Sequence, residues 1–145
     1  MCLYTITKRF NPPDPKVRKG WKFVEEGKDG QLHGIFQCGH GYSTEWQVRR
    51  GSMYPLKTNG DVREEYDTGF HVFPTREDAR KAKRALMSRG WELLSTHSTV
   101  RLVKVEVRDV TCEGIDGTTS EGYYVEAEVR TLVAHSMRIV AVVKD

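Results

Sequence analysis

Residues Gly69–Gly90 read GFHVFPTREDARKAKRALMSRG, and this stretch decides the expected fold. Gly69–Phe73 is a short apolar segment typical of a strand, and Pro74 ends it because proline has no amide hydrogen to donate. Thr75 is a residue type that often caps a helix at its N-terminus, and Asp78, three positions on, completes a weak capping box. The stretch therefore predicts a strand that leads directly into a helix.

The helix itself is predicted over Arg76–Arg89. Ala79, Ala82 and Leu86 recur at helical spacing and form one narrow apolar stripe, which indicates a helix that lies close against a sheet. Gly90 is suited to end the helix, because glycine readily takes up the left-handed conformation found there.

On both sides of this helix the chain is expected to be β-structure. The expected strands are Met1–Thr7, Gly20–Glu25, Gln31–Gln37, Tyr42–Arg50, Gly69–Phe73, Thr99–Val107, Tyr123–Val133 and Arg138–Val143. The expected turns and loops are Asn11–Pro15, Lys28–Gly30, Cys38–Gly41, Asn59–Asp67, Gly114–Gly122 and His135–Ser136. Within Thr99–Val107 the alternation leaves open whether Leu102 or Val103 faces the core. Helices do not alternate with strands, so we expect an α+β fold with a mostly antiparallel, decorated Greek-key-like sheet.

Length and composition predict one domain over residues 1–145 of a protein that stays where it is made. The chain has 145 residues, of which 38% are hydrophobic and 30% charged, with a net charge of +3. We find neither a membrane-spanning apolar run nor a secretion signal. The few, widely spaced cysteines Cys2, Cys38 and Cys112 indicate a reducing compartment. We expect a cytoplasmic protein, in the host cytoplasm if a phage encodes it.

The sequence offers no pattern that predicts catalysis, a metal or a cofactor. Cys38-Gly39-His40 brings two possible metal ligands together, but a structural zinc site needs four. We find no G-x-S-x-G motif, phosphate-binding loop or G-x-G-x-x-G motif. The chain is accordingly predicted to be a binder rather than an enzyme.

Two groups of residues could carry binding. The helix has basic residues around its outer face, which either contact phosphates or merely keep the surface solvated; the second interpretation is favoured. The β region combines aromatic rings with arginines, which are the residue types that hold a base and its phosphates. Aromatic residues on strands also form cores, and the sequence leaves both roles open.

Three segments together resemble a known phage-associated family. They are the hairpin GWKFVEEGKDGQLHGIF (Gly20–Phe36), the junction GFHVFPTREDA (Gly69–Ala79) and the closing MRIV (Met137–Val140). Their order resembles the first class of Thoeris anti-defence proteins, which sequester signalling nucleotides. The resemblance implies a decorated antiparallel domain that forms dimers or larger homo-oligomers. It implies as ligand a cyclic ADP-ribose isomer made by a TIR-domain protein, held uncleaved, and cyclic oligonucleotides at separate sites.

Candidate ligand-binding residues follow from motif position and residue type. We expect base stacking from the aromatic residues, pyrophosphate contacts from the arginines and a polar contact from the histidine. The set is Trp21, Phe23, Phe73, Arg49, Arg101, Arg138 and His71. For Phe73 a place in the core is an equal alternative.

Two other functions stay open at this point. The basic helix and aromatic residues could form a nucleic-acid-binding module, although acidic loops interrupt the basic patches and make nucleic acid an improbable partner. A phage inhibitor that docks on a host protein through an exposed strand edge is the other alternative.

Overall fold

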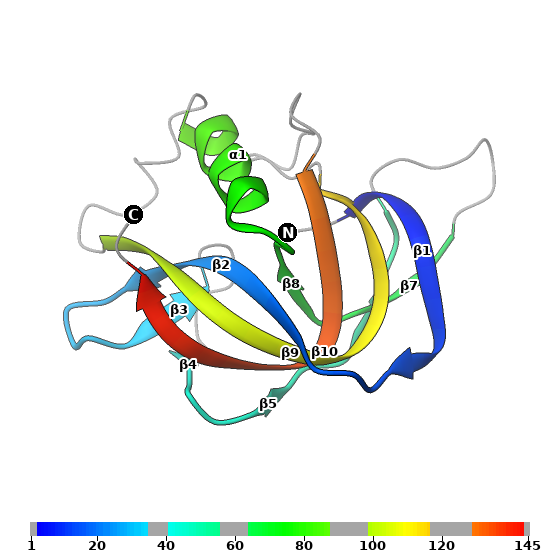
Figure 1. Ribbon diagram of the computed structural model, residues 1–145, viewed down its shortest axis with the longest axis horizontal. Helices are drawn as coiled ribbons and strands as arrows, with labels where there is room; N and C mark the ends of the chain where they lie inside the picture. Colours follow the sequence, from blue (N-terminus) through cyan, green and yellow to red (C-terminus); the bar gives the residue numbers. More distant parts are fainter. Residues whose placement is uncertain (1–2, 35–40, 56–63, 88–98, 117–128, 144–145) are drawn as a thin grey trace.

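Two long strands, β9 (Thr99–Asp116) and β10 (Val129–Val143), form the centre of the fold (Figure 1). The computed structural model describes residues 3–34, 41–55, 64–87, 99–116 and 129–143. The other strands are β1 (Leu3–Asp14), β2 (Arg18–Glu26), β3 (Leu32–Gly34), β4 (Gly41–Tyr42), β5 (Gln47–Val48), β6 (Gly51–Met53), β7 (Tyr66–Thr68) and β8 (Phe70–Val72). The one described helix is α1 (Arg76–Met87).

Every strand pair in the described part of the chain is antiparallel, and β9 pairs with the three other long strands, β1, β2 and β10. Its first half pairs with β2, its second half with β1, and β10 pairs with it along nearly its whole length. The outer edge of β10 pairs with β8 and β5. The order β9-β2-β3-β4 is the spatial order of a Greek key, with a long connection before the strand that closes it. The predicted α+β class with a mostly antiparallel sheet is confirmed.

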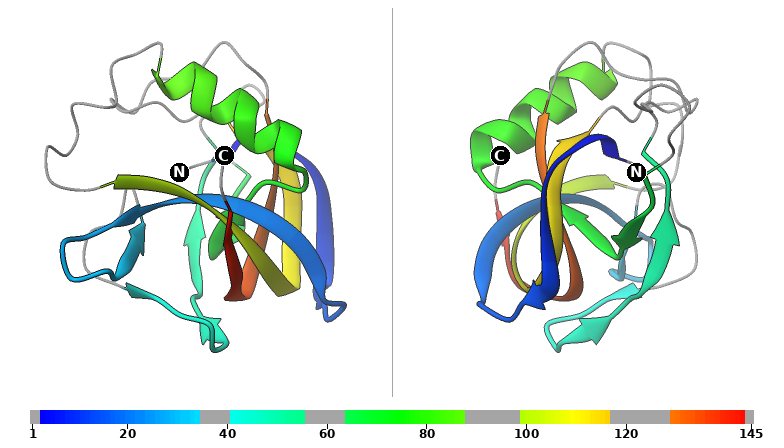
Figure 2. Two further views of the ribbon diagram at one scale, coloured as in Figure 1. Left: turned by 60° about the vertical axis from the view of Figure 1, so that its left-hand side comes forward. Right: turned by 90° about the vertical axis from the view of Figure 1, so that its right-hand side faces the viewer.

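The pair of β9 and β10 bends sharply at the point where the pairing partner of β9 changes from β2 to β1. Asp109 has a positive φ of 58° there. The alternation of side chains breaks at the same place in both strands, since Val107 and Val110 of β9 belong to one buried cluster, as do Ala134 and Met137 of β10. The bend lets one pair of strands enclose the core from two sides (Figure 2).

This bend overturns the prediction of a turn at His135–Ser136. Strand β10 runs through both residues, Ser136 is buried, and the His135 carbonyl accepts a hydrogen bond from the Arg49 amide at 2.8 Å. The polar pair marks a kink within a continuous strand. The predicted loop Gly114–Gly122 is wrong at its start for a similar reason, because β9 continues to Asp116.

The proline-rich segment Asn11–Pro15 was expected to be a loop, but β1 includes it up to Asp14. The pairing register of β1 with β9 is irregular between Arg9 and Asp14. Prolines are tolerated at such an irregularity because no regular ladder of hydrogen bonds requires their missing amide hydrogens. The peptide bond between Asn11 and Pro12 is cis.

Two further expectations need correction. The segment Tyr42–Arg50 contains two short strands, β4 and β5, because the Ser43 hydroxyl accepts a hydrogen bond from the Glu45 amide and turns the chain between them. The predicted loop Asn59–Asp67 ends too late, since Tyr66 already begins β7, which pairs with β6. The predicted turn Cys38–Gly41 ends too late, since Gly41 already begins β4. Four other parts of the predictions lie outside the described residues: the rest of that turn, the turn at Asn59-Gly60, most of Gly114–Gly122 and the segment Tyr123–Glu128.

Helix α1 begins as predicted. The Asp78 amide donates to Thr75 Oγ1 at 3.1 Å, which is the N-terminal cap that the sequence indicated. Ala79 and Ala82 are buried, and α1 packs against β2 and β10. The predicted end at Gly90 and the side chain of Leu86 lie outside the described part of the chain. Figure 2 shows α1 lying across the top of the curved sheet.

Candidate functional site

Three of the predicted site residues meet beneath α1. Trp21 and Phe73 join β2 to the end of β8 through two backbone hydrogen bonds of 2.8 Å. Phe23, two residues along β2 from Trp21, points to the same side, because side chains alternate along a strand. Phe23 and Phe73 are 6% and 2% exposed, whereas Trp21 is only partly buried. Phe23 and Phe73 therefore both belong to the core, whereas Trp21 approaches the surface.

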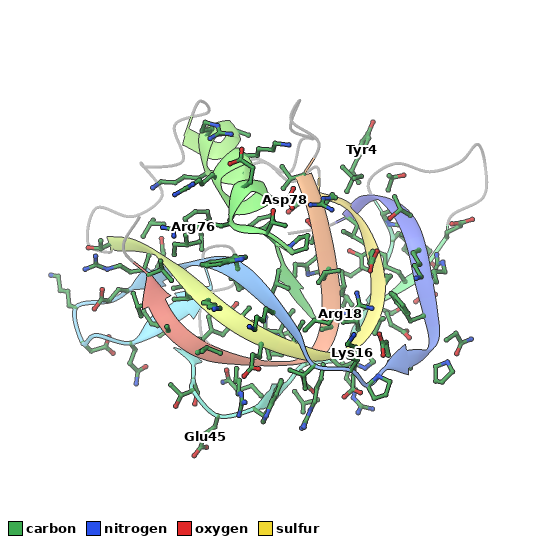
Figure 3. The ribbon with its side chains drawn as sticks, in the orientation of Figure 1. Tyr4, Lys16, Arg18, Glu45, Arg76 and Asp78 are labelled. Atoms are coloured by element: carbon green, nitrogen blue, oxygen red, sulfur yellow. The ribbon has the colours of Figure 1, made fainter. Side chains whose placement is uncertain are left out.

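Two basic side chains of α1 point back toward these rings. The Arg76 guanidinium lies 5.7 Å from the Trp21 ring, and Lys83 Nζ lies 5.7 Å from the Phe23 ring. Lys104 Nζ of β9 also lies near the Trp21 ring, at 5.9 Å from the ring centroid. Figure 3 labels Arg76 and Asp78 at the first turn of α1, between the helix and the sheet. Cations over aromatic faces are attracted to the ring electrons, so the region beneath α1 combines aromatic surface with positive charge.

The expectation that the basic residues of the helix lie around its outer face is wrong for Arg76 and Lys83. Of the described basic residues of α1, Arg80, Lys81 and Arg84 are exposed as expected, and Arg84 forms an ion pair with Glu77 at 3.2 Å. The sequence did contain a signal for the position of these two side chains. Arg76 and Lys83 stand three and four residues from Ala79, so both border the apolar stripe of the helix.

A pocket of about 580 Å³ opens beside the Phe23 ring. It lies where the second half of α1, β2, the start of β9 and the end of β10 come together. Its walls are Phe23, Lys83, Val100, Arg101, Leu102, Val142 and Val143. Arg101 Nε also donates to Glu26 Oε2 at 2.7 Å, with about half of the arginine side chain exposed. Two predicted residues, Phe23 and Arg101, thus line one pocket, together with Lys83, which was not predicted.

The remaining predicted residues lie elsewhere in the fold. Arg138 donates to Glu106 Oε1 from Nε at 3.0 Å and from Nη2 at 2.7 Å, and its guanidinium lies 4.8 Å from the Trp46 ring. The Arg108 guanidinium lies 4.4 Å from the same ring. The Arg49 guanidinium lies 5.0 Å from the Phe70 ring. The structure therefore does not bring Arg49 or Arg138 to the pocket beside Phe23.

His71 is a buried residue between strands. Its Nε2 lies 3.3 Å from the Tyr66 hydroxyl oxygen, and the two rings meet edge to face. Burial lowers the pKa of His71 to about 3, and the positive charges of Lys22 and Arg49 act in the same direction. The imidazole is accordingly neutral at neutral pH.

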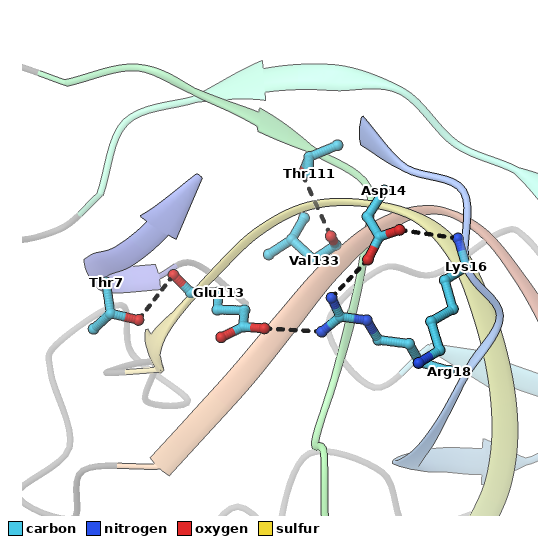
Figure 4. A network of polar contacts seen from close by, with 7 residues as sticks. All are labelled: Thr7, Asp14, Lys16, Arg18, Thr111, Glu113 and Val133. Carbon is cyan, nitrogen blue, oxygen red and sulfur yellow. Dashed lines mark hydrogen bonds and ion pairs between the residues drawn. The ribbon is translucent and has the colours of Figure 1, made fainter. Parts of the chain in front are cut away.

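A second pocket, of about 350 Å³, borders a network of paired charges (Figure 4). Arg18 donates to Asp14 at 2.8 Å and to Glu113 at 2.9 Å. The hydrogen bond from Arg18, followed by that from the Lys16 amide, lowers the pKa of Asp14. Thr7 completes the network by donating to the Glu113 carbonyl. Because these charges satisfy one another, the network ties β1 and β2 to β9.

The described residues offer neither a cluster of metal ligands nor a reactive thiol. No three His, Cys, Asp or Glu side chains lie close enough together there to hold a metal ion. The Cys112 thiol is buried, which raises its pKa to about 11 and makes it a poor nucleophile. Nor does the described part of the chain contain a helix of the length and apolar character that a membrane crossing requires.

Comparison with known proteins adds no relative. No family model, curated protein or solved structure matches this chain.

Proposed function

We propose that this protein is a phage anti-defence sponge, which binds a signalling nucleotide in the pocket beside Phe23 and holds it without cleaving it. The observation that carries the proposal is the convergence of Phe23, Lys83 and Arg101 on one pocket of about 580 Å³. Small-molecule sites commonly have volumes of about 300–1,000 Å³ with a few polar groups in an apolar lining.

The lining suits a ligand that has both a flat apolar part and negative charge. The Phe23 ring and the side chains of Val100, Leu102 and Val142 offer apolar surface to a base. Lys83 and Arg101 offer positive charge to phosphates, and an arginine can bind two phosphate oxygens at once. A cyclic ADP-ribose isomer, the ligand that the family resemblance implies, carries an adenine and a pyrophosphate.

Retention rather than turnover is supported by the chemistry of the lining. The lining residues that the structure describes include no carboxylate, histidine, cysteine or hydroxyl side chain. Hydrolysis of a pyrophosphate or glycosidic bond ordinarily needs a general acid or base, a nucleophile or a metal. We also propose self-association, because Val140 and Val142 of β10 are 48% and 55% exposed and Val142 lines the pocket.

The proposal is tested by titrating the protein with cyclic ADP-ribose isomers in a calorimeter. Replacing Lys83 or Arg101 by alanine removes a charged contact of about 1.5–3 kcal/mol, so we expect the dissociation constant to rise about 10- to 150-fold. Arg80→Ala is the matched control, since it removes the same charge from the exposed face of α1 and should change the dissociation constant little.

The fate of the ligand separates a sponge from an enzyme. Heat denaturation of the loaded protein should release a nucleotide with its original chromatographic mobility and mass. Recovery of linear ADP-ribose would show turnover and would overturn the proposal. Equal binding by wild type, Lys83→Ala and Arg101→Ala would place the ligand elsewhere on the protein.

A further inference from the structure

Two tryptophans lie beside basic side chains on the side of the sheet that carries α1. Lys104 Nζ lies 5.9 Å from the Trp21 ring of β2. Trp46, which stands just before β5, has the Arg108 and Arg138 guanidinium groups at 4.4 and 4.8 Å from its ring. Aromatic rings and positive charge thus meet at two places on this side.

The pairing of β2, β9 and β10 joins these two places into one surface. Lys104 is the register partner of Trp21, and two residues further along β9, Glu106 pairs with Lys19 of β2 and with Arg138 of β10. Figure 1 shows the three strands running on beyond α1, which covers only part of this side. We call this surface the basic face, and its residues are Lys19, Trp21, Trp46, Lys104, Arg108 and Arg138.

The alternation of side chains along β9 keeps the basic face out of the core. Val105 and Val107 are fully buried in the main cluster, so Lys104, Glu106 and Arg108 point to the opposite side. A strand rises by about 3.3 Å per residue, so Lys104 and Arg108 stand about 13 Å apart along the strand.

The basic face carries positive charge that the protein does not neutralise. Glu106 is paired with Arg138, whose Nη2 lies 2.7 Å from the carboxylate. Lys19, Lys104 and Arg108 have no ion-pair partner among the residues that the structure describes. Lys19 is exposed, and Lys104 and Arg108 are partly exposed. A surface of this kind attracts an anionic partner.

The aromatic rings indicate which kind of anion suits the face. Proteins that bind single-stranded nucleic acid combine a line of positive charge for the backbone with aromatic side chains on which unpaired bases stack. Trp21 and Trp46 are both partly exposed, so part of each is accessible to a base. A duplex keeps its bases stacked inside, where these rings cannot reach them.

We propose that the basic face binds single-stranded nucleic acid, with phosphates on Lys19, Lys104 and Arg108 and bases against Trp21 and Trp46. The sequence placed this function on the outer face of the helix, where acidic loops counted against it. The structure offers a different surface, which strand pairing assembles from distant parts of the chain. The basic face shares no residue with the pocket beside Phe23, so this inference does not depend on the nucleotide proposal.

The inference is tested by fluorescence anisotropy with labelled oligo-dT and oligo-U of about 12 nucleotides, a length within the usual range of such sites. Three phosphate contacts to a single strand predict that the dissociation constant rises about 20-fold between about 50 and about 200 mM NaCl. The two oligonucleotides show whether the face accepts DNA, RNA or both.

The variant Lys104→Gln/Arg108→Gln removes two of the predicted phosphate contacts. The slope of log dissociation constant against log salt should fall by about 0.7 for each charge removed. Lys19→Gln should lower it by the same single step, and it is the second variant if the double variant does not fold. Arg80→Gln is the matched control, since it removes a charge from the exposed face of α1 and should leave the slope unchanged.

Three further arms separate this mode of binding from others. An oligonucleotide without bases should bind about fivefold more weakly or worse, and a duplex of equal length should also bind more weakly. The variant Lys83→Ala/Arg101→Ala should bind the oligonucleotides like the wild type. The inference is overturned if no oligonucleotide binds at about 50 mM NaCl, or if the base-free strand or the duplex binds equally well. It is also overturned if the slope survives the substitutions on the basic face, or if the pocket variant abolishes binding.

Discussion

The two sides of strand β2 differ in almost every respect. Toward α1 the strand presents Trp21 and Phe23, which lie under helix cations and border an open pocket. Toward the sheet interior it presents Lys22, whose ammonium group lies near the His71 carbonyl and the Tyr42 ring. Val24 on the same side packs in a buried, mostly aliphatic cluster with residues of β8 and β9. The helix side has large rings, positive charge and access to solvent, whereas the interior side is tightly closed and contains one cation.

The difference shows how a single alternating strand can serve both stability and binding. A closed aliphatic side fixes the position of the backbone, because such packing leaves little freedom to the strand. The aromatic side can then expose part of its surface to a ligand without losing its place. The following predictions test how far this division holds.

The largest effect is expected from Phe73→Ala. Phe73 is 2% exposed and packs with Phe23, Leu102 and the alanines of α1, so its removal leaves a cavity on the helix side. We expect a loss of about 3–5 kcal/mol in the free energy of unfolding, measured by urea denaturation. A loss below about 1 kcal/mol would mean that the helix side of β2 is not a true core. Phe73→Leu is the milder variant if the alanine variant does not fold.

An intermediate effect on stability is expected from lowering the pH, because His71 is buried next to Lys22 on the interior side of β2. The folded pKa of His71 is lowered from 6.5 to about 3, so below pH 6.5 the unfolded chain binds a proton that the folded protein does not. Stability should therefore fall as the pH drops, by about 1.4 kcal/mol per unit and about 2 kcal/mol between pH 6.5 and 5. Urea denaturation at each pH measures this slope.

The matched variant for that measurement is His71→Gln, which cannot titrate in this range. Its stability should change less between pH 6.5 and 5 than that of the wild type. The same slope in both proteins would assign the acid sensitivity to other groups.

The smallest effect is expected from Thr75→Ala at the start of α1. The alanine removes the oxygen that accepts the Asp78 amide and the hydroxyl that donates to Asp78 Oδ2. Loss of such a cap costs about 1 kcal/mol. Because α1 packs over the aromatic side of β2 and supplies Lys83 to the pocket, ligand affinity should fall along with stability. Calorimetry on Thr75→Ala measures both quantities. Thr75→Ser, which retains the hydroxyl, should behave like the wild type.

Features that depend on neighbouring residues could be predicted from the sequence. The start of α1 follows from Thr75 and Asp78, and the hairpin of β2 and β3 follows from the Asp29-Gly30 turn, in which Gly30 has a positive φ of 78°. The choice between Leu102 and Val103 had no unique answer, because both are buried, on opposite sides of β9.

Features set by distant pairing could not be predicted. His135–Ser136 has the composition of a turn, and only the partners β9 and β5 keep those residues in a strand. The candidate site was predicted in part, since Phe23 and Arg101 line one pocket. Residue type alone could not place Arg49 and Arg138, because their positions depend on the pairing of β8, β9 and β10. Lys83 was missed because the helix was judged by its charge rather than by its distance from Ala79.

The central place of β9 has a consequence for the order of events during synthesis. Strands β1 and β2 leave the ribosome early, yet their partner is made much later; Thr7 and Glu113, which are hydrogen-bonded, stand 106 positions apart in the chain. Contacts of such long range slow folding, because the entropy of closing the loop is lost before the contact is gained. Until β9 emerges, the nascent chain must therefore wait with β1 unpaired and with the edge of β2 opposite to β3 unpaired. A ribosome that stalls before residue 99 would leave those two edges exposed to other chains.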